Sequence, residues 1–319
     1  MLHRSILLLG AGFSRNWGGW LAPEVFEYVL GSQYVDEPLR ALLLSNGTRD
    51  FEVVLDNLQQ HVARTGAPDS RLDNLLRAID EMFSEMNRGL SGSANYFWSG
   101  HLNRTMGLFL NRFDAIFTLN QDTLLEAQYL TAHLAEPGNW EGGVIPGLVL
   151  REGDPVSEWP FRGELTPTTA TPAIPSRMQP YIKLHGSSNW RDASGGLMII
   201  GGSKKVAIEK SPLLVWNFQT FEQYLGRPNQ RLMVVGYSFR DAHINSAIAA
   251  ATKTGLRVFL VDPLGLGVLD SPAVAPIEPP FVSFPAAVLP CIRGASRRPL
   301  LTTWISDDVE RNKLLEFLK

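Results

Sequence analysis

The chain has 319 residues, and its 29 lysines and arginines nearly balance 32 aspartates and glutamates, for a formal net charge of -3. A hydrophobic content of 45% and a charged content of 19% are those of an ordinary soluble globular protein with a substantial core. The charge balance gives no electrostatic footprint for nucleic acid or for an anionic membrane surface. The single cysteine, Cys291, excludes an internal disulfide and a structural zinc site built from several thiolates.

An uninterrupted apolar run, Ser5–Leu9, leads directly into the turn Gly10-Ala11-Gly12-Phe13-Ser14. Such a run is typical of a strand buried on both faces in a parallel α/β sheet. Two glycines one residue apart allow a sharp turn and suit the pyrophosphate of a nucleotide, although a turn that binds nothing has the same pattern. The run is too short for a membrane span or a signal h-region, so we expect a cytoplasmic protein that does not enter a membrane.

Residues 23–112 have the periodicity of amphipathic helices. Phe51, Val54, Leu55 and Leu58, for example, recur at three- and four-residue intervals. A helical stretch this long exceeds what one crossover between strands needs. We therefore expect a small helical module inserted into the sheet domain.

The rest of the chain alternates between predicted strands, helices and irregular segments. We expect further strands at 114–119, 181–184, 231–235 and 257–261. Helices are predicted at 123–133, 218–225 and 303–319. A further helix is predicted to begin with a capping box of Ser238 and Asp241 and to end at residue 251. The irregular segments are a loop at 15–20, a region of short strands or surface chain at 137–180, a hairpin at 197–208 with its turn at 201–203, and a proline-dense surface loop at 263–299.

Polar residues follow the predicted strands at the point where each strand ends. They are Gly12 and Ser14, Asn120 and Asp122, His185, Ser238, and Asp262. In an open parallel sheet, ligands bind in the crevice beyond the carboxyl ends of the strands. The sequence therefore predicts a nucleotide pocket along one edge of the sheet.

The order of these motifs resembles the sirtuin-like proteins. The resemblance rests on Gly10-Ala11-Gly12-Phe13-Ser14, Thr118-Leu119-Asn120-Gln121-Asp122, His185-Gly186, Gly236-Tyr237-Ser238 and a strand ending in Asp262. It implies an α/β fold with a Rossmann-like parallel sheet flanked by helices. The implied division is an NAD-binding domain at 1–22 and 113–265, a helical module at 23–112, and a proline-rich segment with a C-terminal helix, 266–319, packing on the main domain.

Two departures indicate which branch of this family the chain resembles. Protein-deacylating sirtuins carry a four-cysteine zinc module, which this chain cannot build, and glutamine precedes their asparagine where Leu119 stands here. The segment Tyr237–Asn245 is also more similar to the bacterial sirtuin-like branch. That branch resembles antiphage defence effectors that hydrolyse NAD, often beside a HerA-type ATPase, a nucleotide sensor or an Argonaute-like protein.

The resemblance implies catalytic roles for two of these residues. Asn120 would orient the attacking water, because an amide both donates and accepts hydrogen bonds, although asparagine is also common in turns. His185 would act as general base on the ribose hydroxyls or on water, while a lone histidine near an apolar strand is often structural. Asp122 would bond the nicotinamide amide or favour the cationic sugar, and it also suits the N-cap of the next helix.

The remaining predicted contacts lie along the phosphates and the adenosine. Ser14 and the backbone of the turn would hold the pyrophosphate, Ser238 a ribose or phosphate, and Asp262 the adenosine ribose. Capping of a helix by Ser238 and a plain turn at Asp262 are the alternatives. The predicted binding residues are Gly10, Ala11, Gly12, Phe13, Ser14, Asp122, Gly236, Ser238 and Asp262, with no metal ligand.

These features predict an NAD+ glycohydrolase that releases nicotinamide and ADP-ribose without zinc. Because such an enzyme would empty a cell of NAD, we expect gating by homo-oligomerisation or by a partner such as a HerA-type ATPase or another defence-system sensor. NAD-dependent protein deacylation and a non-catalytic NAD or ADP-ribose sensor in a larger complex are the alternatives. The chain has no G-x-S-x-G elbow, no Walker lysine motif and no spacing typical of a metal site.

Overall fold

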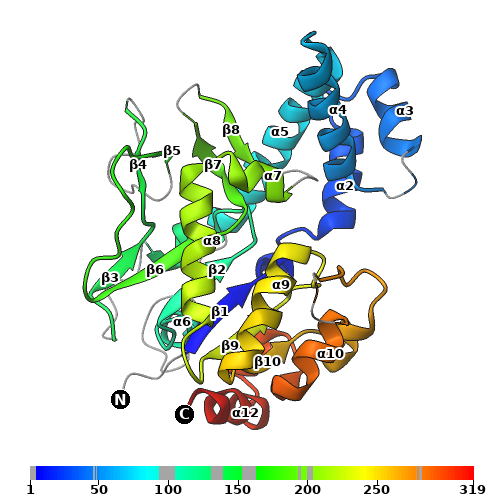
Figure 1. Ribbon diagram of the computed structural model, residues 1–319. Helices are drawn as coiled ribbons and strands as arrows, with labels where there is room; N and C mark the ends of the chain where they lie inside the picture. Colours follow the sequence, from blue (N-terminus) through cyan, green and yellow to red (C-terminus); the bar gives the residue numbers. More distant parts are fainter. Residues whose placement is uncertain are drawn as a thin grey trace.

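A computed structural model describes residues 5–45, 47, 49–92, 105–130, 139–152, 163–192, 195–199, 204–277, 279 and 282–319. Its centre is a seven-stranded sheet, ordered β11-β10-β9-β1-β2-β6-β3, in which every neighbouring pair is parallel (Figure 1). The predicted α/β fold is thus confirmed. The strands of this sheet are β1 (Ser5–Leu9), β2 (Ala115–Thr118), β3 (Gly142–Val144), β6 (Met178–Lys183), β9 (Arg231–Val235), β10 (Arg257–Val261) and β11 (Ile292–Ser296).

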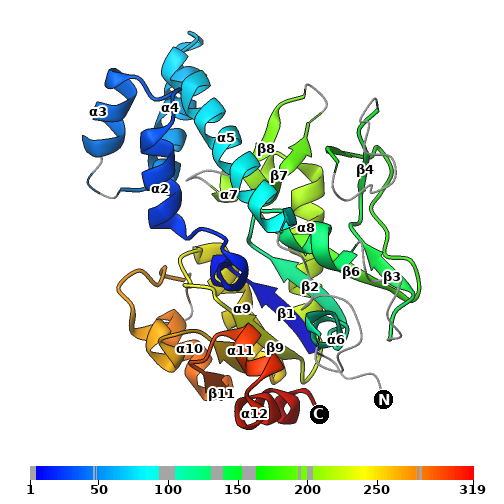
Figure 2. The same ribbon diagram turned by 180° about the vertical axis from the view of Figure 1, so that it is seen from behind.

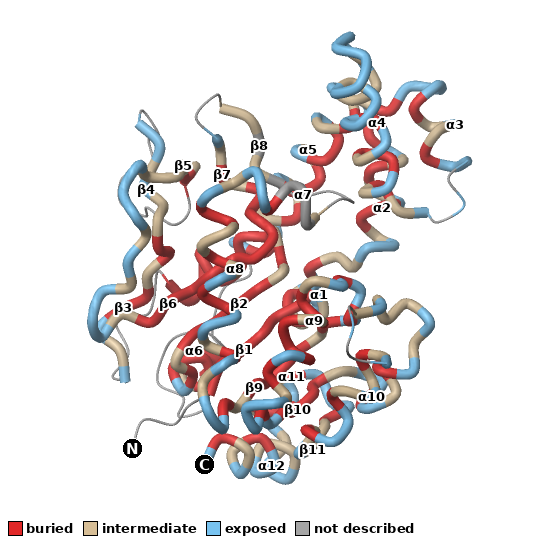
Figure 3. The backbone as a smooth tube through the Cα atoms, viewed as in Figure 1, coloured by how far each residue is buried: buried red, intermediate tan, exposed pale blue. Residues whose placement is uncertain are grey.

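Helices cover both faces of this sheet, because alternate side chains of each strand point to opposite sides. Leu7 and Leu9 pack in one hydrophobic cluster with α6, α11 and α12, and Ile6 and Leu8 pack in a second cluster with α8, α9 and α10 (Figures 1 and 2). The central strands are therefore buried throughout, as Figure 3 shows. These helices are α6 (Met106–Leu110), α8 (Pro212–Leu225), α9 (Ala242–Ala251), α10 (Phe284–Val288), α11 (Leu300–Ile305) and α12 (Asp308–Leu318).

A group of four helices lies between β1 and β2 in the chain and stands at one end of the sheet (Figures 1 and 2). These are α2 (Ala22–Gly31), α3 (Glu37–Ser45), α4 (Phe51–Thr65) and α5 (Ser70–Gly92). Their apolar sides join the cluster that contains Leu7, which agrees with the periodicity of the sequence. The domain boundaries themselves stay a prediction.

A second, smaller sheet has the order β4-β5-β7-β8, and its first two strands fall in the region at 137–180 predicted to hold short strands. Its strands are β4 (Leu148–Leu150), β5 (Leu165–Pro167), β7 (Gly186–Arg191) and β8 (Leu197–Ile199). The turn from β6 into β7 contains His185, so this residue stands where the chain leaves the main sheet for the smaller one. Among the described helices, none has the length and apolar sequence that crossing a bilayer requires.

The predicted loop at 15–20 is wrong in its first half. Helix α1 (Ala11–Ser14) forms within the glycine turn, with Gly10 as its N-cap residue, and a 3-10 turn, Arg15–Trp17, continues it. The side-chain amide of Asn16 donates to the carbonyls of Gly12 and Phe13 at 3.2 and 2.9 Å, which holds this turn closed. The Asn16 side chain thus stabilises a helical turn in a segment whose neighbouring glycines predict a loop.

The predicted hairpin at 197–208 is also wrong. Strand β8 pairs antiparallel with the preceding β7, and residues Lys204–Glu209 form helix α7. The predicted turn at 201–203 lies outside the described residues. The predicted helix at 123–133 is, in its described part, mainly a π-helical turn at Glu126–Leu130.

The C-terminal segment carries more structure than the sequence predicts. Residues 263–299 hold α10, 3-10 turns at Gly265–Asp270 and Leu289–Cys291, and β11, which pairs with β10 as the edge strand of the main sheet. The predicted helix at 303–319 is two helices, α11 and α12. Asp307, which lies between them, is the N-cap of α12, and its side chain accepts a hydrogen bond from the amide of Glu310.

The turns after β1 and β9 meet backbone to backbone at the centre of the sheet. The amide of Gly12 donates to the carbonyl of Gly236 at 3.0 Å, and the amide of Gly10 donates to that of Val235 at 3.0 Å. Gly236 has a φ of +60°, and a Cβ on it would lie 2.4 Å from the Cα of Gly12. Both the backbone conformation and the close approach therefore require glycine at this position.

We expect Gly236→Ala to lower the free energy of unfolding by more than about 2 kcal/mol, because it adds left-handed strain to a backbone clash. Gly89→Ala is the matched control. Gly89 lies inside α5, and a Cβ there meets nothing within 4 Å. It should raise stability by about 0.5–1 kcal/mol. Urea unfolding measures both; equal stability of Gly236→Ala and the wild type would contradict the contact described above.

Candidate active site at the carboxyl edge of the sheet

The residues predicted for the site stand at one edge of the parallel sheet. Gly10 follows β1, Asn120 follows β2, His185 follows β6, Gly236 follows β9 and Asp262 follows β10. Because all these strands are parallel, their carboxyl ends meet at the same edge. The chain runs from β1 to β2 on one side and later to β9 on the other side of β1, so the order of the strands reverses beside the glycine turn.

Three of the predicted residues form a hydrogen-bonded chain. The hydroxyl of Ser14 donates to Oδ2 of Asp122 at 2.8 Å, and the side-chain nitrogen of Asn120 donates to the Ser14 oxygen at 3.0 Å. All three residues are buried. Because the Ser14 proton goes to Asp122, Ser14 must accept from Asn120, which fixes the orientation of the Asn120 amide.

Asp122 also acts as a local cap, as its alternative interpretation predicts. Its Oδ1 accepts the amide of Leu124 at 3.0 Å. The carboxylate therefore has partners on both oxygens in this structure. It positions Ser14, and through Ser14 it positions Asn120.

The backbone of the glycine turn is used differently from the prediction. The amide of Gly12, expected to face a pyrophosphate, donates to Gly236, and the amide of Phe13 donates to the carbonyl of Gly10 at 2.9 Å. The Phe13 side chain is buried against Trp17, with ring centroids 5.1 Å apart. Ala11 is exposed, so it is the most solvent-accessible residue of this turn.

His185 and Asn120 lie on neighbouring strand ends. Strands β2 and β6 pair with Thr118 opposite Lys183, and each of the two site residues follows two positions later. The amide of Leu184 also donates to the carbonyl of Thr118 at 2.9 Å, which continues the pairing beyond the strands. The register of the sheet thus places the two residues predicted to carry the reaction just beyond the ends of neighbouring strands.

His185 is paired with a second histidine that the sequence analysis does not include in the site. Its Nε2 lies 3.1 Å from Nε2 of His243, the second residue of α9. His185 is 2% exposed, whereas His243 is partly exposed. Burial lowers the pKa of His185 to about 3, against the opposing effect of Asp241, so the imidazole is neutral at pH 7.

An ion cluster adjoins the two histidines and was not predicted. Nζ of Lys204 lies 2.9 Å from Asp241 and 3.2 Å from Glu52 of α4. Burial acts to raise the pKa of Asp241, and the nearby His185 and Lys204 outweigh it and lower that pKa to about 2. The cluster joins the helical group to the start of α9, and no sequence spacing marks such a contact.

A buried ion pair lies beneath the Asp122 turn. Lys183 of β6 and Glu126 are both fully buried, with Nζ 2.7 Å from Oε1, and Nζ also donates to the carbonyl of Asp122. Tyr181 donates to the other oxygen of Glu126 at 3.2 Å. A lysine inside the apolar run 181–184 is the sequence signal that could have pointed to this pair, since a buried lysine needs a partner.

Ser238 and Asp262 stand apart from these contacts. Asp241, not Ser238, is the N-cap residue of α9, and its carboxylate bonds Lys204 instead of capping, so the predicted capping box is wrong. Ser238 is exposed. The carboxylate of Asp262 accepts the amide of Leu264 at 2.8 Å, and burial raises its pKa. Their predicted contacts with adenosine stay a prediction.

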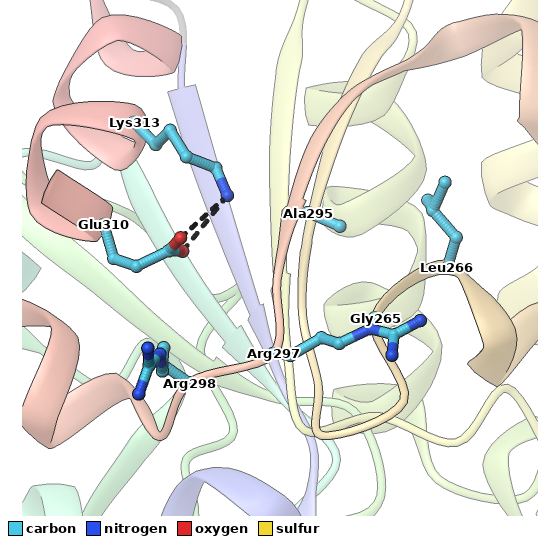
Figure 4. A pocket seen from close by; sticks show the side chains of 7 residues that line it. All are labelled: Gly265, Leu266, Ala295, Arg297, Arg298, Glu310 and Lys313. Atoms are coloured by element: carbon cyan, nitrogen blue, oxygen red, sulfur yellow. Dashed lines mark hydrogen bonds and ion pairs between the residues drawn. The ribbon is translucent and has the colours of Figure 1, made fainter.

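An open pocket of about 390 Å³ lies farther along the same edge, after β10 and β11 (Figure 4). Its basic side chains do not converge, since Arg297 and Arg298 point away from each other and Lys313 is paired with Glu310 at 3.1 Å. No ligand is assigned to it. Within the described ranges, no group of three or more histidine, cysteine or acidic side chains is placed to hold a metal ion.

Comparison with solved structures gives matches at low sequence identity. No family model and no curated protein matches the chain. A triple mutant of Sir2 homologues bound to 2′-O-acetyl ADP ribose matches with a TM-score of 0.44 and 13% identity, over 98% of this chain and 92% of that chain. A Sir2 homologue mutant bound to ADP ribose matches with a TM-score of 0.43 and 10% identity, over 98% and 93%. Membership of the sirtuin-like family stays a prediction.

The burial of neutral His185 predicts a specific loss of stability in acid. Its pKa is lower in the folded protein than the value of about 6.5 in an unfolded chain, so the unfolded state binds more protons between these values and stability falls as the pH drops. At pH 4.5 this amounts to about 3 kcal/mol.

His185→Gln should therefore lose about 3 kcal/mol less than the wild type between pH 7 and pH 4.5 in urea unfolding. His61→Gln, at an exposed position on α4, should keep the wild-type dependence on pH. An identical pH dependence for His185→Gln and the wild type would show that His185 is not held neutral by burial.

Proposed function

We propose that this protein is an NAD+ glycohydrolase that cleaves NAD+ to nicotinamide and ADP-ribose. The observation that supports this most is the placement of Asn120 and His185 on adjacent parallel strand ends, with the amide of Asn120 oriented by Ser14. Hydrolysis needs a water held against the ribose carbon and a group that takes its proton. An oriented amide beside an imidazole supplies both.

The proposed reaction follows from these two side chains. Water adds to the ribose carbon as the bond to the nicotinamide nitrogen breaks, and the electron pair of that bond leaves with nicotinamide. The positive charge that develops on the sugar is favoured by a nearby carboxylate, the part we propose for Asp122. His185 accepts the proton that the water loses, so the products are nicotinamide, ADP-ribose and one proton.

The proposed biological role is that of a gated effector of antiphage defence that depletes NAD. This part rests on the sequence resemblance alone. It includes a homo-oligomer or a partner such as a HerA-type ATPase as the gate, and a cytoplasmic location. The alternatives, an NAD-dependent deacylase and a non-catalytic NAD or ADP-ribose sensor, are separated by the products that the purified protein forms.

We expect Asn120→Ala and His185→Ala each to lower kcat at least about 100-fold, because each removes a group that acts on the attacking water. Chromatography of nicotinamide and ADP-ribose after incubation with NAD+ measures this. Asn57→Ala and His61→Ala, both exposed on α4, are matched controls that should keep full activity.

Three results would contradict the proposed function. The first is wild-type turnover by either site variant. The second is acyl transfer from an acylated peptide as the only reaction, which would favour the deacylase. The third is binding of NAD+ by calorimetry without any cleavage, both alone and after addition of the proteins encoded beside it, which would favour the sensor.

A further inference from the structure

We propose that His243 is a positioning residue for His185: it fixes which ring nitrogen of His185 carries a proton, and it receives the proton that His185 passes on. This inference deepens the proposed function and rests on it for the catalytic step. The pairing of the two rings is a property of the folded protein and is testable without turnover.

The first argument is the geometry of the pair. The two Nε2 atoms are 3.1 Å apart, and the ring centroids are 5.2 Å apart with the planes tilted by 43°. Two neutral imidazoles at this distance share one hydrogen bond, so one Nε2 must carry a proton and the other must not. Within the described part of the chain, Nδ1 of His185 has no hydrogen-bond partner, which makes it the nitrogen for water or substrate.

The second argument is the difference in burial along the pair. His185 is 2% exposed, and a positive charge on it is strongly disfavoured, in keeping with its lowered pKa. His243 is partly exposed at the start of α9, so water can solvate a charge there. A proton taken up at His185 is therefore more stable after transfer to His243.

The proton steps balance as follows. His185 begins with a proton on Nε2, which it donates to the bare Nε2 of His243. When Nδ1 of His185 accepts a proton from the attacking water, the Nε2 proton moves to His243. His185 is then neutral and His243 carries the positive charge. Loss of one proton from His243 and return of the pair to its starting tautomers complete the cycle.

The surroundings of the pair favour a positive charge on His243. Asp241 stands two residues before it and is held by Lys204, which Glu52 contacts from α4. The hydroxyl of Tyr237 accepts the amide of Asp241 at 3.1 Å, which keeps this carboxylate at the head of α9. The carboxylate of Asp241 interacts electrostatically with both rings, and its negative charge favours a positive charge on His243. The ring of Phe218 also packs against His243, with the ring centroids 5.6 Å apart.

The kinetic test uses His243→Gln, which can keep a hydrogen bond to His185 but cannot carry a proton. We expect kcat for NAD+ cleavage to fall at least about 10-fold with little change in KM, and the acid limb of the pH–rate profile to shift. His61→Gln is the matched control. Wild-type kcat and an unchanged pH profile in folded His243→Gln would overturn the proposal.

The second test needs no activity, so it separates failure of this inference from failure of the proposed function. In protein with ¹⁵N-labelled histidine, NMR should show scalar coupling between the two Nε2 atoms and a single tautomer of His185 at pH 7. His243→Ala should abolish the coupling and give a mixture of His185 tautomers. Absence of coupling in the wild type, or an unchanged His185 tautomer in His243→Ala, would overturn the pairing even in an active enzyme.

Discussion

The site depends on a backbone contact between two turns that no side chain could enter. Gly12 and Gly236 approach so closely that a Cβ on either would lie within 2.7 Å of a backbone atom of the other turn. This contact joins the turns that follow the neighbouring strands β1 and β9, and Ser14 lies two residues after Gly12 in the same short helix. Ser14 accepts from Asn120 and donates to Asp122. The backbone contact between the two turns therefore helps to position the Asn120 and Asp122 side chains through Ser14.

The central sheet could be predicted because its strands are buried on both faces and therefore read as uninterrupted apolar runs. The predicted strands at 114–119, 181–184, 231–235 and 257–261 are confirmed as β2, β6, β9 and β10. The edge strand β11 could not be found in this way. Its sequence from Ile292 to Ser296 is half exposed and contains arginine and glycine, so nothing separates it from the proline-rich chain around it. Helix α7 was missed because β8, predicted to form a hairpin with this segment, pairs with the preceding strand β7 instead.

The sequence predicts the part of the candidate site that depends only on where residues stand along the strands. Polar residues that follow parallel strands must meet at one edge, and the register of β2 and β6 then brings Asn120 and His185 together. What the sequence could not give is the set of contacts between distant segments. His243 meets His185 across 58 residues, and Lys204 joins Glu52 to Asp241 from three different helical segments. These contacts bring a second imidazole and charged groups next to the buried His185, and sequence spacing does not contain them.

The central claim is that the carboxyl edge of this sheet binds a dinucleotide between Asn120 and His185. The most direct measurement is a crystal structure of the protein with ADP-ribose, supported by calorimetry of the same complex. The account predicts the pyrophosphate beside the turn from Gly10 to Ser14 and the terminal ribose within hydrogen-bond distance of both site residues. Binding only in the pocket beside Arg297, or no binding in either measurement, would contradict it.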